Sequence, residues 1–202
     1  MSGVPILVEA SALRVLIVGG GAVGARKAKQ FALAGADVRV IAPSFCEDMQ
    51  HLVAERGLFV ERRPYETGDI GDAHLVFAAT NDRHVNAHVA REAEAGHRLL
   101  NAADQSDEGN FAVMAAHHRG PLTVGVSAGG VPAAALRIRD AIAERFDARY
   151  ADALTDLRAL RKRLIASGEA HQWREKSPEL INEEFCDAVE GGALSERIAQ
   201  WP

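Results

Sequence analysis

Apolar and polar positions in the first half of the chain alternate between short continuous apolar runs and longer stretches with helical spacing. The first apolar run, at 15–18, has the length and composition of a parallel strand buried on both faces. The stretch at 22–34 has small or apolar residues at helical spacing and ends at Gly35. The same signals predict strands at 38–41, 58–61, 75–79 and 99–101, and helices at 45–56 and 82–95.

Strands that alternate with helices in this way predict an α/β fold, a Rossmann-type doubly wound parallel sheet with helices on both faces. The pattern changes in the second half, where one more strand is expected at 122–126. After it only helices are expected, at 133–146, 150–166, 178–189 and 193–200. We therefore expect a Rossmann domain over 1–112, a small segment over 113–147 and a helical C-terminal domain over 148–202.

A glycine-rich stretch, VGGGAVGARKA, joins the first strand to the first helix. Its Gly-x-Gly-x-x-Gly spacing is formed by Gly19, which permits a tight turn, Gly21, which lets backbone approach a pyrophosphate, and Gly24, which lets helix and sheet pack closely. The helix N-terminus adds free N–H groups and a partial positive charge that favour phosphate. The motif predicts a dinucleotide site; the alternative is a glycine turn that binds no ligand.

The second strand lacks the acidic residue that usually binds the adenosine ribose, because Ala42, Pro43 and Ser44 stand at its end. Ser44 and main-chain groups near Pro43 are expected to hold the ribose instead. Arg39 lies before the strand end and should project from the strand, so we do not interpret it as a clamp for a 2′-phosphate. NAD is therefore favoured over NADP as the cofactor.

A second polar signal, Thr80-Asn81-Asp82, follows the fourth strand. Ligands of open α/β sheets bind beyond the carboxyl ends of the strands, so Thr80 and Asn81 are expected to lie next to the cofactor. Thr, Asn and Asp are also good helix N-caps, and capping is an equally good reading of this stretch. The two interpretations are compatible.

Composition and charge are those of an ordinary globular protein: of 202 residues, 48% are hydrophobic and 25% are charged. The formal net charge of −5 argues against nucleic acid or an acidic membrane as a partner. No apolar run approaches the roughly 20 residues needed to cross a bilayer, and the N-terminus does not have the pattern of a signal peptide. Cys46 and Cys186 have neither disulfide nor metal-site spacing, so a reducing, cytoplasmic location is expected.

Four stretches in this order resemble one family: VLIVGGGAVGARKA, VFAATND, LLNAADQSDEGNF and RGPLTVGVSAGG. Over roughly residues 5–150 the chain is similar to the precorrin-2 dehydrogenase / sirohydrochlorin ferrochelatase family, the siroheme synthase N-terminal module. The resemblance implies NAD-dependent oxidation of precorrin-2 to sirohydrochlorin, followed in some members by insertion of Fe²⁺ to make siroheme. It also implies a homodimer, with the segment after the Rossmann domain forming much of the interface.

The family's NAD contacts carry over to this sequence by position. They map onto Gly21, Ala22 and Val23 in the glycine loop, and onto Pro43 and Ser44 after the second strand. The family itself lacks the ribose-binding acid there, so its absence here is expected.

The family's functional carboxylate closes an N-V-V-D stretch, which is Asn101-Ala102-Ala103-Asp104 in this chain. The resemblance thus assigns catalysis to Asp104. A carboxylate after the fifth strand could accept a proton from the macrocycle as hydride leaves for NAD, and could remove pyrrole protons during metal insertion. The alternative is an Asp that forms a turn or caps a helix.

Precorrin-2 is an octacarboxylate, so a chain of net charge −5 must concentrate positive charge locally. We interpret the turn of Ser127, Gly129 and Gly130, together with Arg137 on the following helix, as a binding region for substrate carboxylates. Arginines at 119 and 139 flank it. The alternative is a domain hinge with solvated arginines. The chain departs from the family pattern here, at Met114 and at 131–133, which affects the chelatase assignment more than the dehydrogenase.

Two histidine pairs could suggest a metal. His84 and His88 share a face of a predicted helix, but no third ligand is identifiable, so a solvated helix face is favoured. His117 and His118 lie in the substrate region and could assist protonation or iron delivery, although adjacent histidines need not point the same way. We predict no permanent metal site.

A different class of function stays open, a non-catalytic NAD-binding regulatory module. In such a protein a Rossmann domain would sense the cofactor and the helical tail would transmit the signal. Asp104 and the RGPLTVGVSAGG stretch favour the enzyme, because a sensor needs neither.

Overall fold

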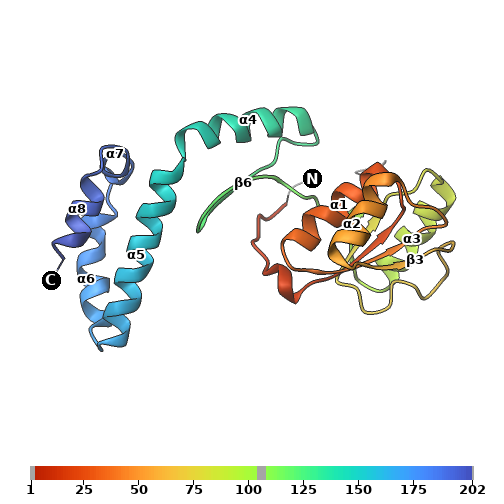
Figure 1. The fold of residues 1–202 in the computed structure, drawn as a ribbon, viewed down its shortest axis with the longest axis horizontal. Helices are drawn as coiled ribbons and strands as arrows, with labels where there is room; N and C mark the ends of the chain where they lie inside the picture. Colours follow the sequence, from red (N-terminus) through yellow and green to blue (C-terminus); the bar gives the residue numbers. More distant parts are fainter. Residues whose placement is uncertain (1–2, 104–107, 202) are drawn as a thin grey trace. The chain divides into compact units, whose positions relative to one another are not determined.

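The computed structural model describes residues 3–103 and 108–201. The chain divides into two compact units, 1–113 and 114–202 (Figure 1). The further division expected at residue 147 stays a prediction.

The first unit is a five-stranded, fully parallel sheet in the order β3-β2-β1-β4-β5. Its strands are β1 (Arg14–Val18), β2 (Asp37–Ile41), β3 (Phe59–Glu61), β4 (Leu75–Ala78) and β5 (Leu99–Ala102). A short 3₁₀ turn at Ala10–Ala12 precedes β1. Helix α1 (Ala22–Leu33) joins β1 to β2, α2 (Glu47–Arg56) joins β2 to β3, and α3 (Arg83–Ala95) joins β4 to β5, whereas β3 and β4 are joined by a loop. The predicted doubly wound α/β fold is confirmed.

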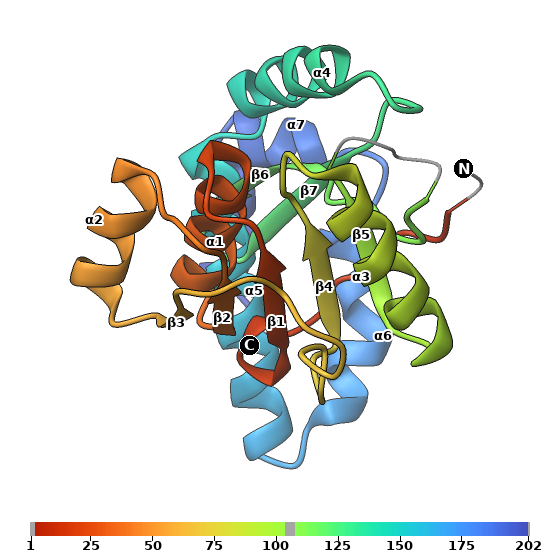
Figure 2. The same cartoon turned by 90° about the vertical axis from the view of Figure 1, so that its right-hand side faces the viewer.

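The two faces of the sheet pack into two separate cores. Val15 and Ile17 of β1 face the core shared with α1 and α2, whereas Leu16 and Val18 face the core shared with α3. Figure 2 shows β1 and β4 between α1 and α3. Because β1 is covered on both faces, it reads as a continuous apolar run instead of an alternating one. The strand order reverses between β1 and β4, and the carboxyl edge at this point is where such sheets bind ligands.

The second unit begins with an antiparallel hairpin of β6 (Ala115–Arg119) and β7 (Leu122–Val126), which turns at Gly120 with φ of 53°. Five helices follow: α4 (Pro132–Arg145), α5 (Ala148–Ala166), α6 (Ala170–Leu180), α7 (Phe185–Glu190) and α8 (Ala193–Ala199). Leu157, Leu160 and Leu164 line the buried face of α5 and form a core with the last three helices. No helix in the described part of the chain combines the length and the apolar character needed to cross a membrane.

Two elements of the second unit differ from the expectation. Strand β6 was not expected, because AAHHR has no apolar alternation; its buried side is formed in part by His117. The prediction of one helix over 178–189 is wrong. Helix α6 ends at Leu180, residues 181–184 form a turn, and α7 starts at Phe185. Pro178 is compatible with the last turn of α6, so it does not mark a helix start.

Candidate functional site

Three of the four glycines in the loop after β1 are required by the packing of the protein itself. A Cβ at Gly19 would overlap the carbonyl oxygen of Ala79, and Gly19 also has a φ of 131°, which side-chain-bearing residues rarely adopt. A Cβ at Gly20 would overlap the carbonyl oxygen of Ser44, and one at Gly24 would overlap that of Gly19. The loop is therefore pressed against the ends of both β2 and β4.

Gly21 differs from its neighbours, because nothing within 4 Å would meet a Cβ there. Its φ and ψ of −81° and −176° are extended values open to any residue, so no described contact and no strain explains a glycine here. A bound group that approaches the backbone closely does explain it, as the pyrophosphate does in dinucleotide sites. The open space beside Gly21 therefore fits a bound nucleotide.

The N-terminus of α1 is also prepared for an anion. Gly21 is its N-cap and provides no side-chain acceptor, and the first turn contains no acidic residue. The first amides of the helix, those of Ala22, Val23 and Gly24, thus lack a capping side chain and add to the positive end of the helix dipole.

The segment after β2 is bound directly to the glycine loop. The backbone N–H of Cys46 donates to the carbonyl oxygen of Gly20 at 2.8 Å, and that of Gly19 donates to Ile41 at 2.9 Å. Pro43 and Ser44 lie exposed between these two ties, whereas Phe45 is buried. The structure therefore brings the residues predicted to contact the ribose beside those predicted to contact the pyrophosphate.

Thr80 lies on the other side of the loop, held by a buried amide. The Oδ1 of Asn86 accepts from the Thr80 hydroxyl at 2.7 Å and from its backbone N–H at 3.2 Å, and the Asn86 amide donates to the Thr80 carbonyl at 3.0 Å. Asn86 is only 2% exposed. Asp82 is the N-cap of α3 and accepts from the backbone N–H of His84 at 2.8 Å. Asn81 and Asp82 are both exposed, whereas Thr80 is half-buried. Sequence reasoning missed Asn86, although a polar residue on the buried side of a helix was the available signal.

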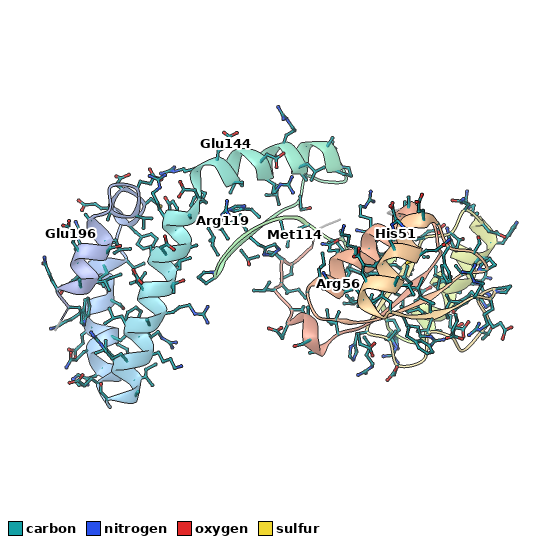
Figure 3. The ribbon with its side chains drawn as sticks, in the orientation of Figure 1. His51, Arg56, Met114, Arg119, Glu144 and Glu196 are labelled. Atoms are coloured by element: carbon teal, nitrogen blue, oxygen red, sulfur yellow. The ribbon has the colours of Figure 1, made fainter. Side chains whose placement is uncertain are left out.

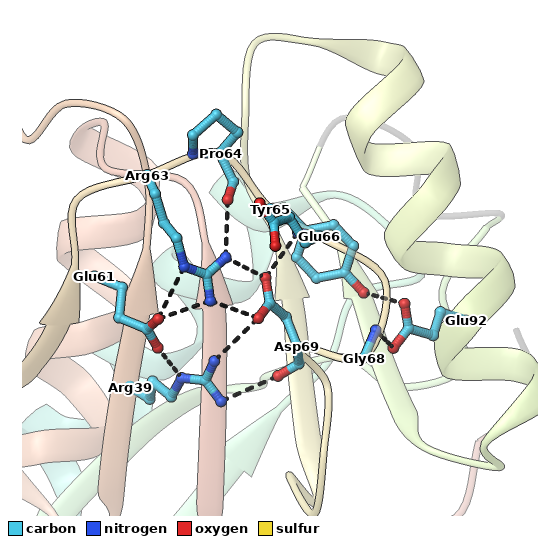
Figure 4. Close-up of polar contacts among 9 residues, drawn as sticks. All are labelled: Arg39, Glu61, Arg63, Pro64, Tyr65, Glu66, Gly68, Asp69 and Glu92. Atoms are coloured by element: carbon cyan, nitrogen blue, oxygen red, sulfur yellow. Dashed lines mark hydrogen bonds and ion pairs between the residues drawn. The ribbon is translucent and has the colours of Figure 1, made fainter.

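A network of arginines and carboxylates joins β2, the end of β3 and the segment between β3 and β4 (Figure 4). Arg39 of β2 donates to Glu61 at 2.8 Å, and Arg63 bridges Glu61 and Asp69 at 2.7 and 2.6 Å. The hydrogen bond from Arg63 is the main reason why the pKa of Asp69 lies below its ordinary value, and the same holds for Glu61. Arg39 is thus occupied by carboxylates, in line with its exclusion as a phosphate clamp.

The segment after β5 approaches the same edge of the sheet, since the N–H of Ala103 donates to the Ala78 carbonyl at 3.0 Å. The predicted catalytic residue, Asp104, lies outside the described residues.

The predicted substrate region belongs to the second unit. Gly129 and Gly130 have φ of 56° and 88°, in the left-handed region, and form the turn that leads into α4. Ser127 and Arg137 are exposed. Arg139, by contrast, is paired with Asp140 at 2.6 Å.

The side chains of three histidines of the two pairs have partners within the fold. His88 bonds the Thr67 hydroxyl at 2.9 Å and contacts the edge of Tyr65. His117 is buried and bonds the Phe146 carbonyl at 2.7 Å, while His118 is exposed and bonds Thr123. Among the described residues, no three His, Cys, Asp or Glu side chains are grouped closely enough to hold a metal ion.

Comparison with known proteins agrees with this geometry. Residues 6–115, more than half of the chain, match a family described as "Putative NAD(P)-binding". The siroheme synthase of Pseudoalteromonas atlantica is 34% identical over 133 residues, covering 66% of this chain and 29% of the relative. The siroheme synthase of Pseudomonas aeruginosa is 32% identical over 200 residues, covering 98% of this chain and 41% of the relative. The chain thus spans less than half the length of these curated relatives.

The whole chain also resembles a solved structure, that of SirC, precorrin-2 dehydrogenase. The TM-score is 0.74 at 25% sequence identity, with 98% of this chain and 100% of SirC covered. The chain belongs to this NAD(P)-binding family, and the resemblance to precorrin-2 dehydrogenases and siroheme synthases seen in its motifs is confirmed. The cofactor class that follows is a nicotinamide dinucleotide.

Proposed function

We propose that the chain is an NAD-dependent dehydrogenase that oxidises precorrin-2 to sirohydrochlorin. The observation that carries the proposal is Gly21, a glycine that no described contact explains, at the uncapped start of α1. The resemblance to SirC and to siroheme synthases supports the choice of substrate. The reaction removes two hydrogens from the macrocycle, one as hydride and one as a proton.

Each part of the site has a defined role in this proposal. Gly19, Gly20 and Gly24 shape the loop, while the amides of 21–24 bind the pyrophosphate, and Pro43 and Ser44 hold the adenosine ribose. Thr80 and Asn81 border the cofactor at the end of β4. NAD supplies the hydride acceptor when bound, and Asp104 accepts the proton that the macrocycle releases.

Ser127, Gly129, Gly130 and Arg137 are proposed to bind carboxylates of the tetrapyrrole. The Arg137 side chain is exposed and forms no ion pair with the residues that the structure describes, which supports this role, because a buried or paired arginine is not available to a substrate. Insertion of Fe²⁺ into sirohydrochlorin is a second step that the same carboxylate could assist, with the metal as a substrate and not as a resident ion.

A homodimer is proposed with the second unit as its interface. In the described chain β6 and β7 pair only with each other, which leaves both outer edges of the hairpin open to another strand. Helix α4 adds exposed apolar side chains, among them Leu136 at 45% and Ile138 at 48% exposure. A reducing, cytoplasmic setting is supported by the unlinked Cys46 and Cys186.

The test is anaerobic incubation of the full chain with precorrin-2 and NAD, followed by absorption spectroscopy. We expect the sirohydrochlorin spectrum to appear together with NADH in equal amounts. NAD binding without oxidation would favour the non-catalytic regulatory module. Addition of Fe²⁺ to sirohydrochlorin then tests metal insertion separately.

A further inference from the structure

Arg62 is a basic residue at the adenosine side of the site that the roles above leave unassigned. It follows the last residue of β3, and its guanidinium lies 5.0 Å from the centroid of the Phe45 ring. Arg62 is exposed and has no ion pair with any carboxylate in the described part of the chain. Its neighbours Glu61 and Arg63 are both held in the network with Asp69.

The strand register places Arg62 next to the end of β2. Ile41 is paired with Glu61, and the N–H of Ala42 donates to the Glu61 carbonyl at 3.1 Å. Arg62 therefore stands beside Ala42 at the carboxyl edge of the sheet. The end of β2 is the position from which an acidic residue normally reaches the ribose 2′-hydroxyl, and Arg62 lies beside it on the neighbouring strand.

The ring of Phe45 connects Arg62 to the glycine loop. A Cβ at Gly20 would lie 2.7 Å from Cδ1 of Phe45, so this ring packs directly against the loop, and Arg62 lies over the same ring. The Arg62 guanidinium lies over the Phe45 ring and has no carboxylate partner among the described residues, so its N–H groups can bind a phosphate in two places.

The residues directly after β2 carry no charge that would repel a phosphate. No acid stands at 42–44, the first acids of the segment, Glu47 and Asp48, lie in the first turn of α2, and the carboxylates of Glu61 and Asp69 are bound by Arg39 and Arg63. A site that rejects NADP usually has an acidic residue after β2 that repels the 2′-phosphate, and a site that prefers NADP needs an arginine without a carboxylate partner. This site lacks such an acid at 42–44 and contains such an arginine, Arg62, among its described residues.

We propose that Arg62 binds the 2′-phosphate of NADP, so that the site accepts NADP in addition to NAD and binds NADP more tightly. The inference rests on the proposed function, because it places the adenosine ribose after β2. Arg62 is thereby the residue that sets the preference between the two nucleotides.

The experiment measures binding to the full chain by calorimetry, with the fragments 2′,5′-ADP and 5′-ADP as well as NADP and NAD. We expect 2′,5′-ADP to bind at least about tenfold more tightly than 5′-ADP, since a charge-assisted arginine–phosphate contact distinguishes them. Raising the salt concentration should reduce this preference. In Arg62→Ala the preference should disappear, whereas binding of 5′-ADP and NAD should change by less than about threefold. Arg62→Lys, which keeps the charge without the planar fork, should retain part of it.

Arg56→Ala is the matched control. Arg56 is an exposed arginine at the last position of α2 (Figure 3), and α2 starts at the glycine loop and runs away from it. It should leave all four affinities unchanged. If 2′,5′-ADP binds no more tightly than 5′-ADP, or the preference survives in Arg62→Ala, the role of Arg62 is wrong while the NAD site stands. If no nucleotide binds to the wild type, both the inference and the proposed cofactor site are wrong.

Discussion

The backbone N–H of Cys46 donates a 2.8 Å hydrogen bond to the carbonyl oxygen of Gly20. This bond joins the glycine loop after β1 to the segment after β2. Because Gly19 is in turn pressed against Ala79 at the end of β4, three strand ends are tied together by main-chain contacts. Main-chain contacts thus set the shape of the site. Gly19, Gly20 and Gly24 are needed for packing, whereas we propose that Gly21 is needed only for binding.

Substitutions of Gly20 and Gly21 should separate folding from binding. Gly20→Ala places a Cβ on the Ser44 carbonyl, so we expect it to lower the free energy of unfolding by about 1–3 kcal/mol. Gly21→Ala meets open space and should change the stability by less than about 1 kcal/mol, yet weaken NAD binding about tenfold or more. Chemical denaturation and calorimetry measure the two effects. Unchanged NAD affinity in Gly21→Ala would remove the main support for the cofactor site.

Asn86 and Asn81 make a second contrast at the end of β4. Asn86→Ala removes three hydrogen bonds to Thr80 from a buried position, so we expect a loss of about 1–3 kcal/mol in unfolding free energy and weaker NAD binding. Asn81→Ala alters an exposed side chain and should leave stability unchanged while weakening NAD binding. If Asn81→Ala binds NAD like the wild type, Asn81 is no cofactor contact and Thr80-Asn81-Asp82 serves only to start α3.

Most of the Rossmann unit could be predicted from the sequence because its signals are local. The apolar run of β1 requires burial on both faces, and the glycine spacing requires a strand before it and a helix after it. Strand β6 and helix α6 could not be predicted, because their burial comes from partners distant in sequence. His117 is buried, and its ring Nε2 hydrogen-bonds the carbonyl oxygen of Phe146, which lies 29 residues further along the chain.

The candidate site was predictable to the extent that motifs mark it. Gly21 and Ser44 follow from their positions relative to the strands, whereas Asn86 and Arg62 depend on contacts between elements. The register of β3 against β2 is needed to place Arg62 beside Ala42, and β3 has only three residues. A strand that short carries too little pattern to fix its register in advance.

Asp104→Asn tests the proton acceptor. The variant should lower kcat for precorrin-2 oxidation by about 10²–10⁴, the usual contribution of a general base, and leave the Kd for NAD unchanged. Steady-state kinetics and calorimetry measure these quantities. Asp107→Asn, the other aspartate of the same stretch of sequence, is the control and should retain activity. Full activity in Asp104→Asn would show that another group takes the proton.

Arg137→Ala tests the carboxylate-binding region of the second unit. Loss of one exposed charge–carboxylate contact should raise the KM for precorrin-2 about three- to tenfold with little change in kcat, because the interaction is made equally in the ground and transition states. Arg158→Ala, which removes an exposed arginine of α5, should leave KM unchanged. A normal KM in Arg137→Ala would favour the reading of this region as a hinge with solvated arginines.

The network around Asp69 should give the first unit a defined sensitivity to acid. Hydrogen bonds from Arg63 hold the pKa of Asp69 below its ordinary value of 3.8 in the folded state, and its side chain is only 10% exposed. A carboxyl whose folded pKa is depressed contributes its full stability above the unfolded pKa and loses it as the pH falls through the folded pKa. Stability should therefore decline below about pH 4.

Asp69→Asn removes this contribution. We expect the variant to be less stable than the wild type by about 1–3 kcal/mol at pH 7, since it loses charge-assisted bonds to Arg63 and Arg39, and to show a shallower decline in acid. Denaturant titrations between pH 3 and pH 7 measure both effects, and Asp72→Asn, at an aspartate that is 81% exposed, should follow the wild-type curve within about 1 kcal/mol. Parallel pH curves for Asp69→Asn and the wild type would mean that the ion pairs seen around Asp69 do not stabilise the fold.

Since the same network holds both neighbours of Arg62, a destabilised Asp69→Asn should also lose part of its preference for 2′,5′-ADP over 5′-ADP.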